Sequence, residues 1–275
     1  MENYYLGNGR KWTYINKTVN REITDKATDE LINKLLYQRG LYTADDTQLF
    51  LKPSLGNLHD PFLLDGMKAA VDRILLAIRN KERILIYGDY DADGVSATSI
   101  LIRYFKTLDL QVDYYIPDRV DEGYGISETA VEFISNSDFD LVITVDCGIS
   151  AGSQVAEIVE KCKKRDKTID IIITDHHQCN EELIPDALAI INPHLPNSDY
   201  PFKNLCGAGV ALKLIHALGI CTGNARAFED YLDLAAIATI ADIVDLKGEN
   251  RIIAKFGMEK ILKNPCVGIK ALLNV

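Results

Sequence analysis

Acidic and histidine side chains follow three apolar runs of the sequence, at the points where those runs end. The residues are Asp89, Asp91, Asp93, Asp146, Asp175, His176 and His177. If the runs are parallel strands, their carboxyl ends meet at one edge of a sheet, where ligands bind in open α/β folds. Carboxylates gathered there repel one another, and burying them unpaired is costly in free energy. A positive group must therefore offset them.

Divalent cations are the simplest source of that positive charge. No arginine closely flanks these motifs, and Cys147, which directly follows Asp146, has no cysteine partner within the motifs. Aspartate oxygens with neutral histidine nitrogens suit Mn²⁺, Mg²⁺ or Zn²⁺. These motifs supply more ligand side chains than one ion needs. We therefore expect two ions sharing a bridging carboxylate, an arrangement that hydrolyses phosphate esters.

Each motif taken alone also has an ordinary structural explanation. Asp91 and Asp93 beside Gly94 are typical of a turn, and Asp146 before a glycine is typical of another. A histidine pair after a strand is usually a surface or half-buried feature. These explanations lose weight because all three motifs must coincide at one edge. A calcium loop is disfavoured because the downstream glutamate is missing.

Asp242 stands near the end of a long apolar segment, residues 234–244. A lone carboxylate on an apolar helix is costly if it is buried unpaired. Asp242 either lies exposed at the end of its helix or turns inward to a metal. The residues alone leave both arrangements open.

Apolar runs alternate with helical segments in the middle of the chain. The strands expected are 84–87, 112–116, 141–145, 171–174 and 187–191, and the helices between them are 94–107, 127–135 and 151–164. This alternation predicts an α/β fold, a mostly parallel sheet with helices on both faces. The carboxyl-terminal edge of that sheet would position the motifs.

Helical patterns flank the predicted sheet on both sides. Residues 1–80 are expected to form a helical N-terminal lead-in packed on the core, with helices beginning near residue 28 and at 43–51 and 66–79. A catalytic domain then spans 81–275. It ends in a helical C-terminal segment with helices at 207–218, 225–241 and 250–263.

The charge balance is acidic. The 275 residues include 30 Lys+Arg and 40 Asp+Glu, which gives a formal net charge of −10. This argues against a protein that coats nucleic acid or an anionic membrane, although it does not say where the charges lie. No apolar run approaches the ~18 residues that span a bilayer, and no signal peptide is expected. The six cysteines lack a C-x-x-C pair, so we expect reduced thiols in a cytoplasmic protein.

The motifs resemble, in order and spacing, the metal-site motifs of the DHH phosphoesterase superfamily. They are Asp91-Ala92-Asp93-Gly94, Asp146, Asp175-His176-His177 and Asp242. Within the superfamily the chain is most similar to the RecJ family of bacterial single-strand-specific 5′→3′ exonucleases, over about residues 10–270. Further segments carry this resemblance: 58–61, 86–90, 117–119, 122–125, 191–193 and 204–211.

The resemblance implies a set of metal ligands and catalytic residues. The ligands of two Mn²⁺ or Mg²⁺ ions would be Asp91, Asp93, Asp146, His176 and Asp242. Asp146 would bridge the ions, and Asp89 would be either a further ligand or a support for one. His177 would contact the scissile phosphate or support the site, and Asp175 would orient the neighbouring histidine.

The resemblance also implies contacts with nucleic acid. Arg119 and Arg103 would hold phosphate, and Tyr124 would stack on a base. A solvated turn arginine and a packed loop aromatic remain the alternatives for Arg119 and Tyr124. Departures from the family pattern at Gln178-Cys179 and Asp245 affect loops beside the site and leave the ligands intact.

The implied activity is metal-dependent release of 5′-mononucleotides from single-stranded DNA in repair and recombination. Single-stranded DNA is the expected partner, with a single-strand-binding protein or a helicase as protein partners and a monomeric chain. The DHH-associated C-terminal and oligonucleotide-binding domains of the family have no counterpart in the sequence, so a catalytic-domain fragment is expected. Two alternatives stay open: a DHH enzyme acting on oligoribonucleotides, cyclic dinucleotides or phosphoadenosine phosphate, and a non-catalytic scaffold.

Overall fold

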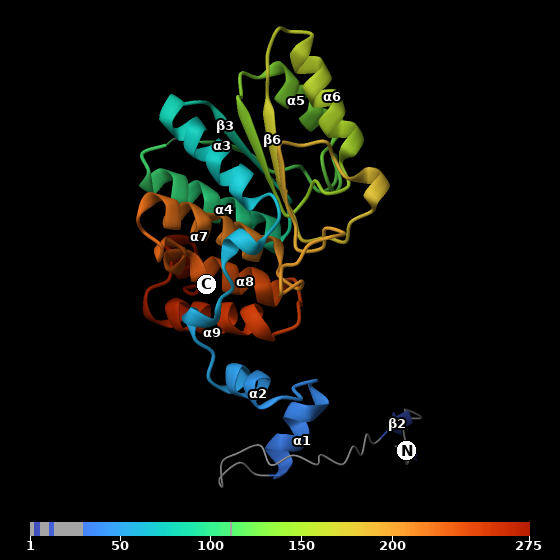
Figure 1. The fold of residues 1–275 in the computed structure, drawn as a ribbon, viewed down its shortest axis with the longest axis vertical. Helices are drawn as coiled ribbons and strands as arrows, with labels where there is room; N and C mark the ends of the chain where they lie inside the picture. Colours follow the sequence, from blue (N-terminus) through green and yellow to red (C-terminus); the bar gives the residue numbers. More distant parts are fainter. Residues whose placement is uncertain (1–2, 6–10, 14–29, 111) are drawn as a thin grey trace. The chain divides into compact units, whose positions relative to one another are not determined.

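The computed structural model describes residues 3–5, 11–13, 30–110 and 112–275, which form two compact units, 1–53 and 54–275 (Figure 1). In the first unit, strand β1 (Asn3–Tyr5) pairs antiparallel with β2 (Lys11–Thr13), a strand pair that the sequence did not predict. Helices α1 (Glu30–Gln38) and α2 (Ala44–Leu51) follow. The start expected for the first helix, near residue 28, lies outside the described residues.

The second unit is built on a five-stranded, all-parallel sheet in the order β4-β3-β5-β6-β7. Its strands are β3 (Ile84–Gly88), β4 (Asp113–Tyr115), β5 (Leu141–Val145), β6 (Asp170–Thr174) and β7 (Ala189–Ile191). The last residues of the four adjoining strands β3, β5, β6 and β7 pair with one another in register. The segments that follow these strands therefore start at the same level, as predicted.

Helices cover both faces of this sheet (Figure 1), which confirms the α/β fold. One face packs against α3 (Met67–Asn80), α4 (Ala92–Thr107) and α7 (Gly207–Thr222), and the other against α5 (Glu128–Asn136) and α6 (Gly152–Lys163). Successive side chains of a strand point to opposite faces of the sheet. Ile86 lies in the first core and Leu85 and Tyr87 in the second.

The compact units divide after Pro53, whereas the sequence analysis placed a boundary after residue 80. Two short 3₁₀ turns, η1 (Leu55–Asn57) and η2 (Pro61–Leu63), and helix α3 belong to the same unit as the sheet. The reason is burial: Met67, Val71 and Ile74, spaced along one face of α3, are fully buried in the core against the sheet.

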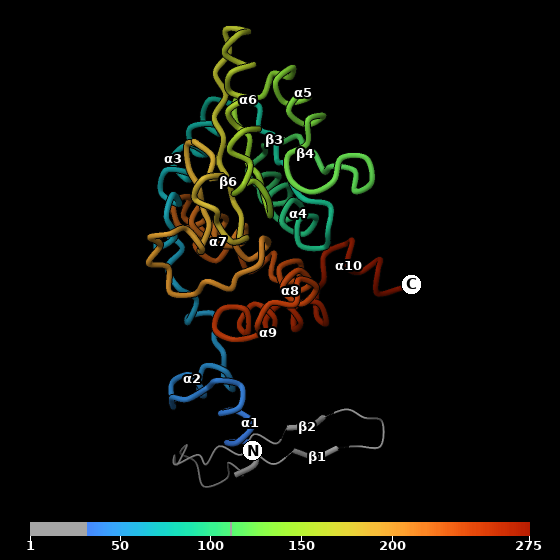
Figure 2. Tube along the Cα trace, turned by 90° about the vertical axis from the view of Figure 1, so that its right-hand side faces the viewer, coloured from blue at the N-terminus to red at the C-terminus, as the bar shows by residue number. Residues whose placement is uncertain are grey.

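The C-terminal part is helical, as predicted, with two differences. The expected helix 225–241 begins as a 3₁₀ turn, η4 (Ala227–Tyr231), before α8 (Leu232–Ala241), and a short helix α10 (Val267–Leu272) was not predicted. Between them runs α9 (Gly248–Lys263). Helix α8 packs against both α4 and α9 (Figure 2). This packing brings the end of α8 to the start of α4, where the first acidic motif, Asp91-Ala92-Asp93-Gly94, lies.

A buried ion pair joins α7 to α9. Lys213 Nζ lies 2.7 Å from Glu249 Oε1, and both side chains are almost fully buried. The same carboxylate accepts hydrogen bonds from the Tyr200 hydroxyl at 2.5 Å and the His59 amide at 3.0 Å. This network ties the segment before α3 to the helices behind the site. Among the described residues, none of the helices has the length and apolar character needed to cross a bilayer.

Candidate metal centre

The loop from β3 to α4 presents three aspartates through helix capping. Asp91 is the N-cap of α4, and its Oδ1 atom accepts hydrogen bonds from the amides of Asp93 at 2.7 Å and Gly94 at 3.0 Å. An aspartate suits this position because it satisfies free amides of the first turn. The cap fixes the loop, so that Asp89 and Asp93 are both buried beside it.

Asp93 connects this loop to the start of α7. Its two carboxylate oxygens accept hydrogen bonds from the amides of Gly207 at 2.6 Å and Ala208 at 2.7 Å. Burial raises the pKa of Asp93 despite these two bonds and a nearby histidine. Helix α7 has no side-chain cap of its own. Asp93 therefore supplies the negative charge that its N-terminus favours.

Asp146 lies at the centre of the site with a strained backbone. It directly follows β5 and has φ of 61°, in the left-handed region that costs a non-glycine residue free energy. Its Oδ1 atom is buried without a hydrogen-bond partner among the described residues. Burial, followed by the charges of Asp93 and Asp91, raises the pKa of Asp146 well above its usual range. Gly207 leaves room for the Asp146 carboxylate, because a Cβ at position 207 would lie 2.4 Å from Asp146 Oδ1.

Three carboxylates converge on His176. Its Nε2 atom lies 3.1 Å from Asp146 Oδ1, 3.7 Å from Asp93 Oδ2 and 3.9 Å from Asp242 Oδ2. Asp242 is the C-cap of α8, and its side chain turns toward the cluster while remaining 26% exposed. The structure thus brings Asp242 to the site, where the sequence left two arrangements open. Burial also raises the pKa of Asp242.

The donor atoms fall into overlapping groups that fit two cations. Each group has ligand atoms within 4.8 Å of one another; the groups are Asp93–His176–Asp242, Asp89–Asp91–Asp146 and Asp146–His176–His177. Asp146 belongs to two of the three groups, the position a bridging ligand needs. Asp89 Oδ1, like Asp146 Oδ1, is buried and lacks a hydrogen-bond partner in the described part of the chain. Oxygen-rich donors with one or two imidazoles suit Mn²⁺ or Mg²⁺.

Asp175 holds His177 rather than facing the cluster. Its oxygens accept hydrogen bonds from the Ile149, His176 and His177 amides and from His177 Nδ1 at 2.7 Å. Burial alone would raise the pKa of Asp175, but the bond and charge of His177 outweigh it, so the pKa is lowered. The same bond raises the pKa of His177. An ionised Asp175 thus orients a histidine that favours its charged form.

Tyr124 lies against His177, a contact that the sequence did not reveal. Its hydroxyl is 3.0 Å from Nδ1 and 3.3 Å from Nε2 of His177, and the residue is 56% exposed. Asn192 was also missed: it directly follows β7, is fully buried, and donates a hydrogen bond to the His177 carbonyl at 3.0 Å. Its signal was the same as for the motifs, a polar residue at the end of a strand.

The two arginines lie in different places. Arg119 lies over the ring of Tyr90, 5.4 Å from its centroid, next to the first acidic motif. Arg103 lies over the ring of Tyr231 at 5.3 Å. It is ten residues beyond Asp93 on α4, or about 15 Å along the helix axis at ~1.5 Å per residue. The structure therefore brings Arg119 near the site and does not bring Arg103 there.

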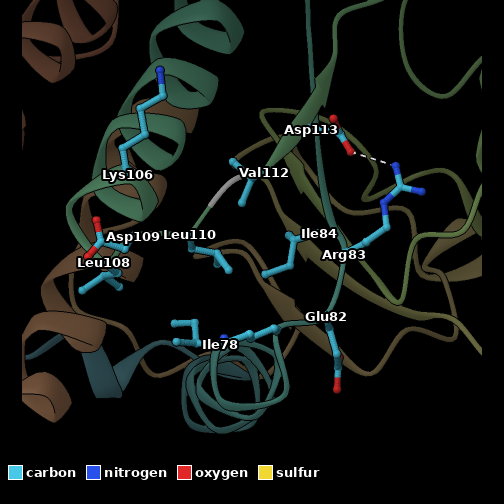
Figure 3. A pocket seen from close by; sticks show the side chains of 11 residues that line it. Ile78, Glu82, Arg83, Ile84, Lys106, Leu108, Asp109, Leu110, Val112 and Asp113 are labelled. Carbon is cyan, nitrogen blue, oxygen red and sulfur yellow. Dashed lines mark hydrogen bonds and ion pairs between the residues drawn. The ribbon is translucent and has the colours of Figure 1, made fainter.

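Two cavities help to delimit the site. A cavity of about 810 Å³ lies at the amino-terminal edge of the sheet, between Ile78 and Ile84, with the ion pair Arg83–Asp113 at 3.1 Å on its rim (Figure 3). This edge is opposite the metal ligands, so that cavity is separate from the site. A second cavity of about 500 Å³ opens beside His177.

Comparisons with known proteins agree with this geometry. The model of the DHH family, N-terminal domain, matches residues 83–239. The single-stranded-DNA-specific exonuclease RecJ of Bacillus subtilis is 46% identical over 245 residues, covering 89% of this chain and 30% of that protein. RecJ of Escherichia coli is 35% identical, covering 89% of this chain and 43% of its own length. The chain thus spans less than half of these relatives.

Solved structures agree as well. A crystal structure of exonuclease RecJ bound to manganese superimposes with a TM-score of 0.70 at 36% identity, covering 80% of this chain and 53% of the other. RecJ from Thermus thermophilus in complex with Mn²⁺ gives a TM-score of 0.69 at 32% identity, covering 87% of this chain and 32% of the other.

Proposed function

Because the chain belongs to the DHH family, we propose that it hydrolyses phosphodiester bonds with two Mn²⁺ or Mg²⁺ ions. The substrate we propose is single-stranded DNA, shortened from its 5′ end with release of 5′-mononucleotides in repair and recombination. The observation that carries the proposal is the convergence of carboxylates from three elements on His176, around the buried Oδ1 atom of Asp146, which makes no hydrogen bond with the described residues and lies 3.1 Å from His176 Nε2.

We assign the ligands from the groups of donor atoms. Asp93, His176 and Asp242 would hold one ion, Asp89 and Asp91 the other, and Asp146 both. When bound, two such cations would supply a water of lowered pKa and would offset negative charge on the phosphate. The chain contributes a rigid frame, since backbone amides already hold Asp91 and Asp93 in place.

The remaining side chains would bind and orient the substrate. In the charged form of His177, which Asp175 favours, Nδ1–H donates to Asp175 and Nε2–H, beside the Tyr124 hydroxyl at 3.3 Å, can donate to a phosphate oxygen. Arg119, supported by the ring of Tyr90, is placed to hold a phosphate of the strand near the first motif. A contact of Arg103 with phosphate remains a prediction that would require the strand to run along α4.

The substrate is tested with single strands labelled at either end. We expect Mn²⁺-dependent release of labelled mononucleotide from the 5′-labelled strand at once, and from the 3′-labelled strand only at completion. EDTA should stop the release. Release that begins at the 3′ end, or turnover confined to a dinucleotide or phosphoadenosine phosphate, would replace single-stranded DNA with another DHH substrate. A chain that binds no Mn²⁺ would instead favour the scaffold alternative.

The proposal extends to partners and location. We propose a cytoplasmic monomer that works with a single-strand-binding protein or a helicase. RecJ proteins of Bacillus subtilis and Escherichia coli, which are named as acting on single-stranded DNA, support the substrate rather than these finer points. Sedimentation of the purified chain, alone and with a single-stranded oligonucleotide, tests the monomer.

A further inference from the structure

Asn192 joins two of the loops that leave the carboxyl-terminal edge of the sheet. It directly follows β7, and its side chain is fully buried. Its Nδ2 atom donates a hydrogen bond to the His177 carbonyl at 3.0 Å, and its Oδ1 atom accepts one from the His194 amide at 2.7 Å. The side chain thus uses a donor and an acceptor at once, which a primary amide can do without carrying a charge.

The neighbouring backbone holds Asn192 level with the loop that carries the two histidines. Strands β6 and β7 pair in register at their last residues, and the Asp175 amide extends this pairing by donating to the Ile191 carbonyl at 3.1 Å. Pro193 follows Asn192, and a residue before proline favours extended backbone. The bond from the His194 amide closes an Asx-turn. Both the backbone and the side chain of Asn192 are therefore fixed.

The bond from Asn192 completes the support of His177. Asp175 Oδ1 accepts a hydrogen bond from the His177 amide at 3.1 Å and lies 2.7 Å from Nδ1 of its ring. Asn192 holds the carbonyl on the other side of the same Cα atom. Because amide, carbonyl and ring nitrogen are all bonded, His177 cannot turn without breaking a hydrogen bond. The direction of Nε2, the atom that we assign to the phosphate, depends on all three.

A second contact crosses the same gap between loops. Gln178 Nε2 lies 3.2 Å from Nδ1 of His194. Two successive residues of the histidine loop, His177 and Gln178, are thus bonded to the turn that begins at Asn192. Gln178 is one of the positions where the sequence departs from the family pattern, so the contact that ties down this position is one of the chain's own.

Burial alone does not account for an amide at this position. An apolar side chain after β7 would fill the same space without the cost of taking polar atoms out of water. Ile191, the preceding residue, already packs into the core. The amide of Asn192 is instead engaged with the backbones of His177 and His194, above the edge of the sheet where the metal ligands lie.

We propose that Asn192 is a positioning residue for the reaction: it holds the His177 carbonyl and thereby aims the His177 ring at the scissile phosphate. This rests on the proposed function, which places the phosphate at His177. The side chain of Asn192 is buried away from the substrate, and its hydrogen bonds go to backbone atoms rather than to an assigned metal ligand. Its effect on turnover should therefore exist only while the ring of His177 is present.

A double-mutant cycle tests that dependence. Asn192→Leu keeps the approximate size of the side chain and removes its donor and acceptor. It should lower Mn²⁺-dependent release from the 5′-labelled strand by about 10- to 100-fold, as the loss of supporting hydrogen bonds does around metal sites. In a His177→Ala chain the same substitution should change release by less than about twofold, because no ring remains to be aimed. Single turnovers with the chain in excess keep slow release measurable. An equal loss in both chains would overturn the proposal.

Asn250→Leu is the matched control. Asn250 is the other buried asparagine among the described residues, and its Nδ2 atom also donates to backbone carbonyls, those of Asn204 and Asp245. Its effect on release should be the same with and without the ring of His177. If Asn250→Leu depended on His177 as strongly as Asn192→Leu does, the coupling would reflect general damage to the fold, and the proposal would fail.

Magnetic resonance of the histidine rings gives a readout that needs no turnover. The signals of His177 are identified by their loss in His177→Ala. In EDTA, Asn192→Leu should shift the His177 signals and leave those of His216, on α7, in place. Asn192→Ser should do the same in a chain whose turn is intact, because a hydroxyl can still accept from the His194 amide but is too short for the His177 carbonyl. Unshifted His177 signals in both variants would overturn the proposal.

The two proposals fail in different ways. Shifted His177 signals in Asn192→Leu, without Mn²⁺-dependent release of mononucleotides by the wild type, would refute the exonuclease activity while supporting the positioning of His177. Release that Asn192→Leu lowers equally with and without the His177 ring would support the activity and overturn the role of Asn192.

Discussion

Asp93→Ala should damage the fold as well as the metal centre. The side chain accepts two backbone hydrogen bonds, at 2.6 and 2.7 Å, and is almost fully buried. Hydrogen bonds to a charged group are worth ~1.5–3 kcal/mol each, so their loss costs about 3–6 kcal/mol. Removing a carboxylate whose pKa is raised by burial relieves part of this cost. We therefore expect a net loss near 3 kcal/mol, the lower end of the range.

Asp242→Ala is the matched control. Asp242 also faces His176, at 3.9 Å, but its side chain is 26% exposed. Its backbone amide bonds to Ala238 through the main chain, which the substitution leaves intact. In EDTA the free energy of unfolding should change by less than ~1 kcal/mol, as for a surface substitution. Both variants should lose Mn²⁺-dependent release of nucleotides, because each removes a ligand.

Urea unfolding in EDTA measures the stabilities, and the labelled-strand assay measures turnover. At a slope of ~3 kcal/mol per molar urea, the midpoint of Asp93→Ala should fall by about 1 M and that of Asp242→Ala should hardly move. An Asp93→Ala chain as stable as the wild type would refute the role of Asp93 in capping α7. Retained Mn²⁺-dependent turnover in Asp242→Ala would refute the ligand assignment.

Three further perturbations test the frame around the site. Gly207→Ala puts a Cβ 2.4 Å from Asp146 Oδ1 and should weaken Mn²⁺ binding, measured calorimetrically, by about 10- to 100-fold; unchanged affinity would mean that Asp146 is free to move. Lys213→Met leaves Glu249 buried and unpaired and should cost about 3–5 kcal/mol in urea unfolding, with recovery on adding Glu249→Gln; a harmless single variant would contradict the buried pair. Burial, then the charge of Lys213, lowers the pKa of His216 to about 4 from 6.5, so the unfolded chain takes up the proton first. Stability should therefore fall as pH drops from 6.5 to 4, by about 1–2 kcal/mol because His216 is only partly buried and solvent screens its charge, and His216→Asn should flatten that part of the profile.

The sheet was predictable because its signals are local. Parallel strands buried on both faces read as unbroken apolar runs, and the strands at Ile84–Gly88, Leu141–Val145 and Asp170–Thr174 begin and end within one residue of the predicted ranges. The convergence of motifs at one edge followed from that topology. Helix α10 was missed because a six-residue helix is too short to show a period.

The contacts that organise the site were not predictable, because their partners are distant in the sequence. Asp93 is bonded to amides more than a hundred residues away, at the start of α7, and nothing in the first acidic motif marks that partner. Arg103 shows the converse case, a residue whose place relative to the motif could not be read from its type. Its residue type suits phosphate, but helix geometry carries it away from Asp93 and onto Tyr231. The type of a residue indicates which chemistry it can do, whereas the tertiary fold decides which residues lie close enough to act together.

The acidic charge of the chain is best understood from how each aspartate is satisfied. Backbone amides already hold Asp91, Asp93 and Asp175 without any ion. Asp146 Oδ1 and Asp89 Oδ1 are buried with no hydrogen-bond partner among the described residues. Besides the His176 ring 3.1 Å from Asp146 Oδ1, cations are therefore the groups that can offset the charge of these two carboxylates, while Asp91, Asp93 and Asp175 supply a frame that exists beforehand. A net charge of −10 is then compatible with a nucleic-acid substrate, because the cations would make the local field attractive to phosphate.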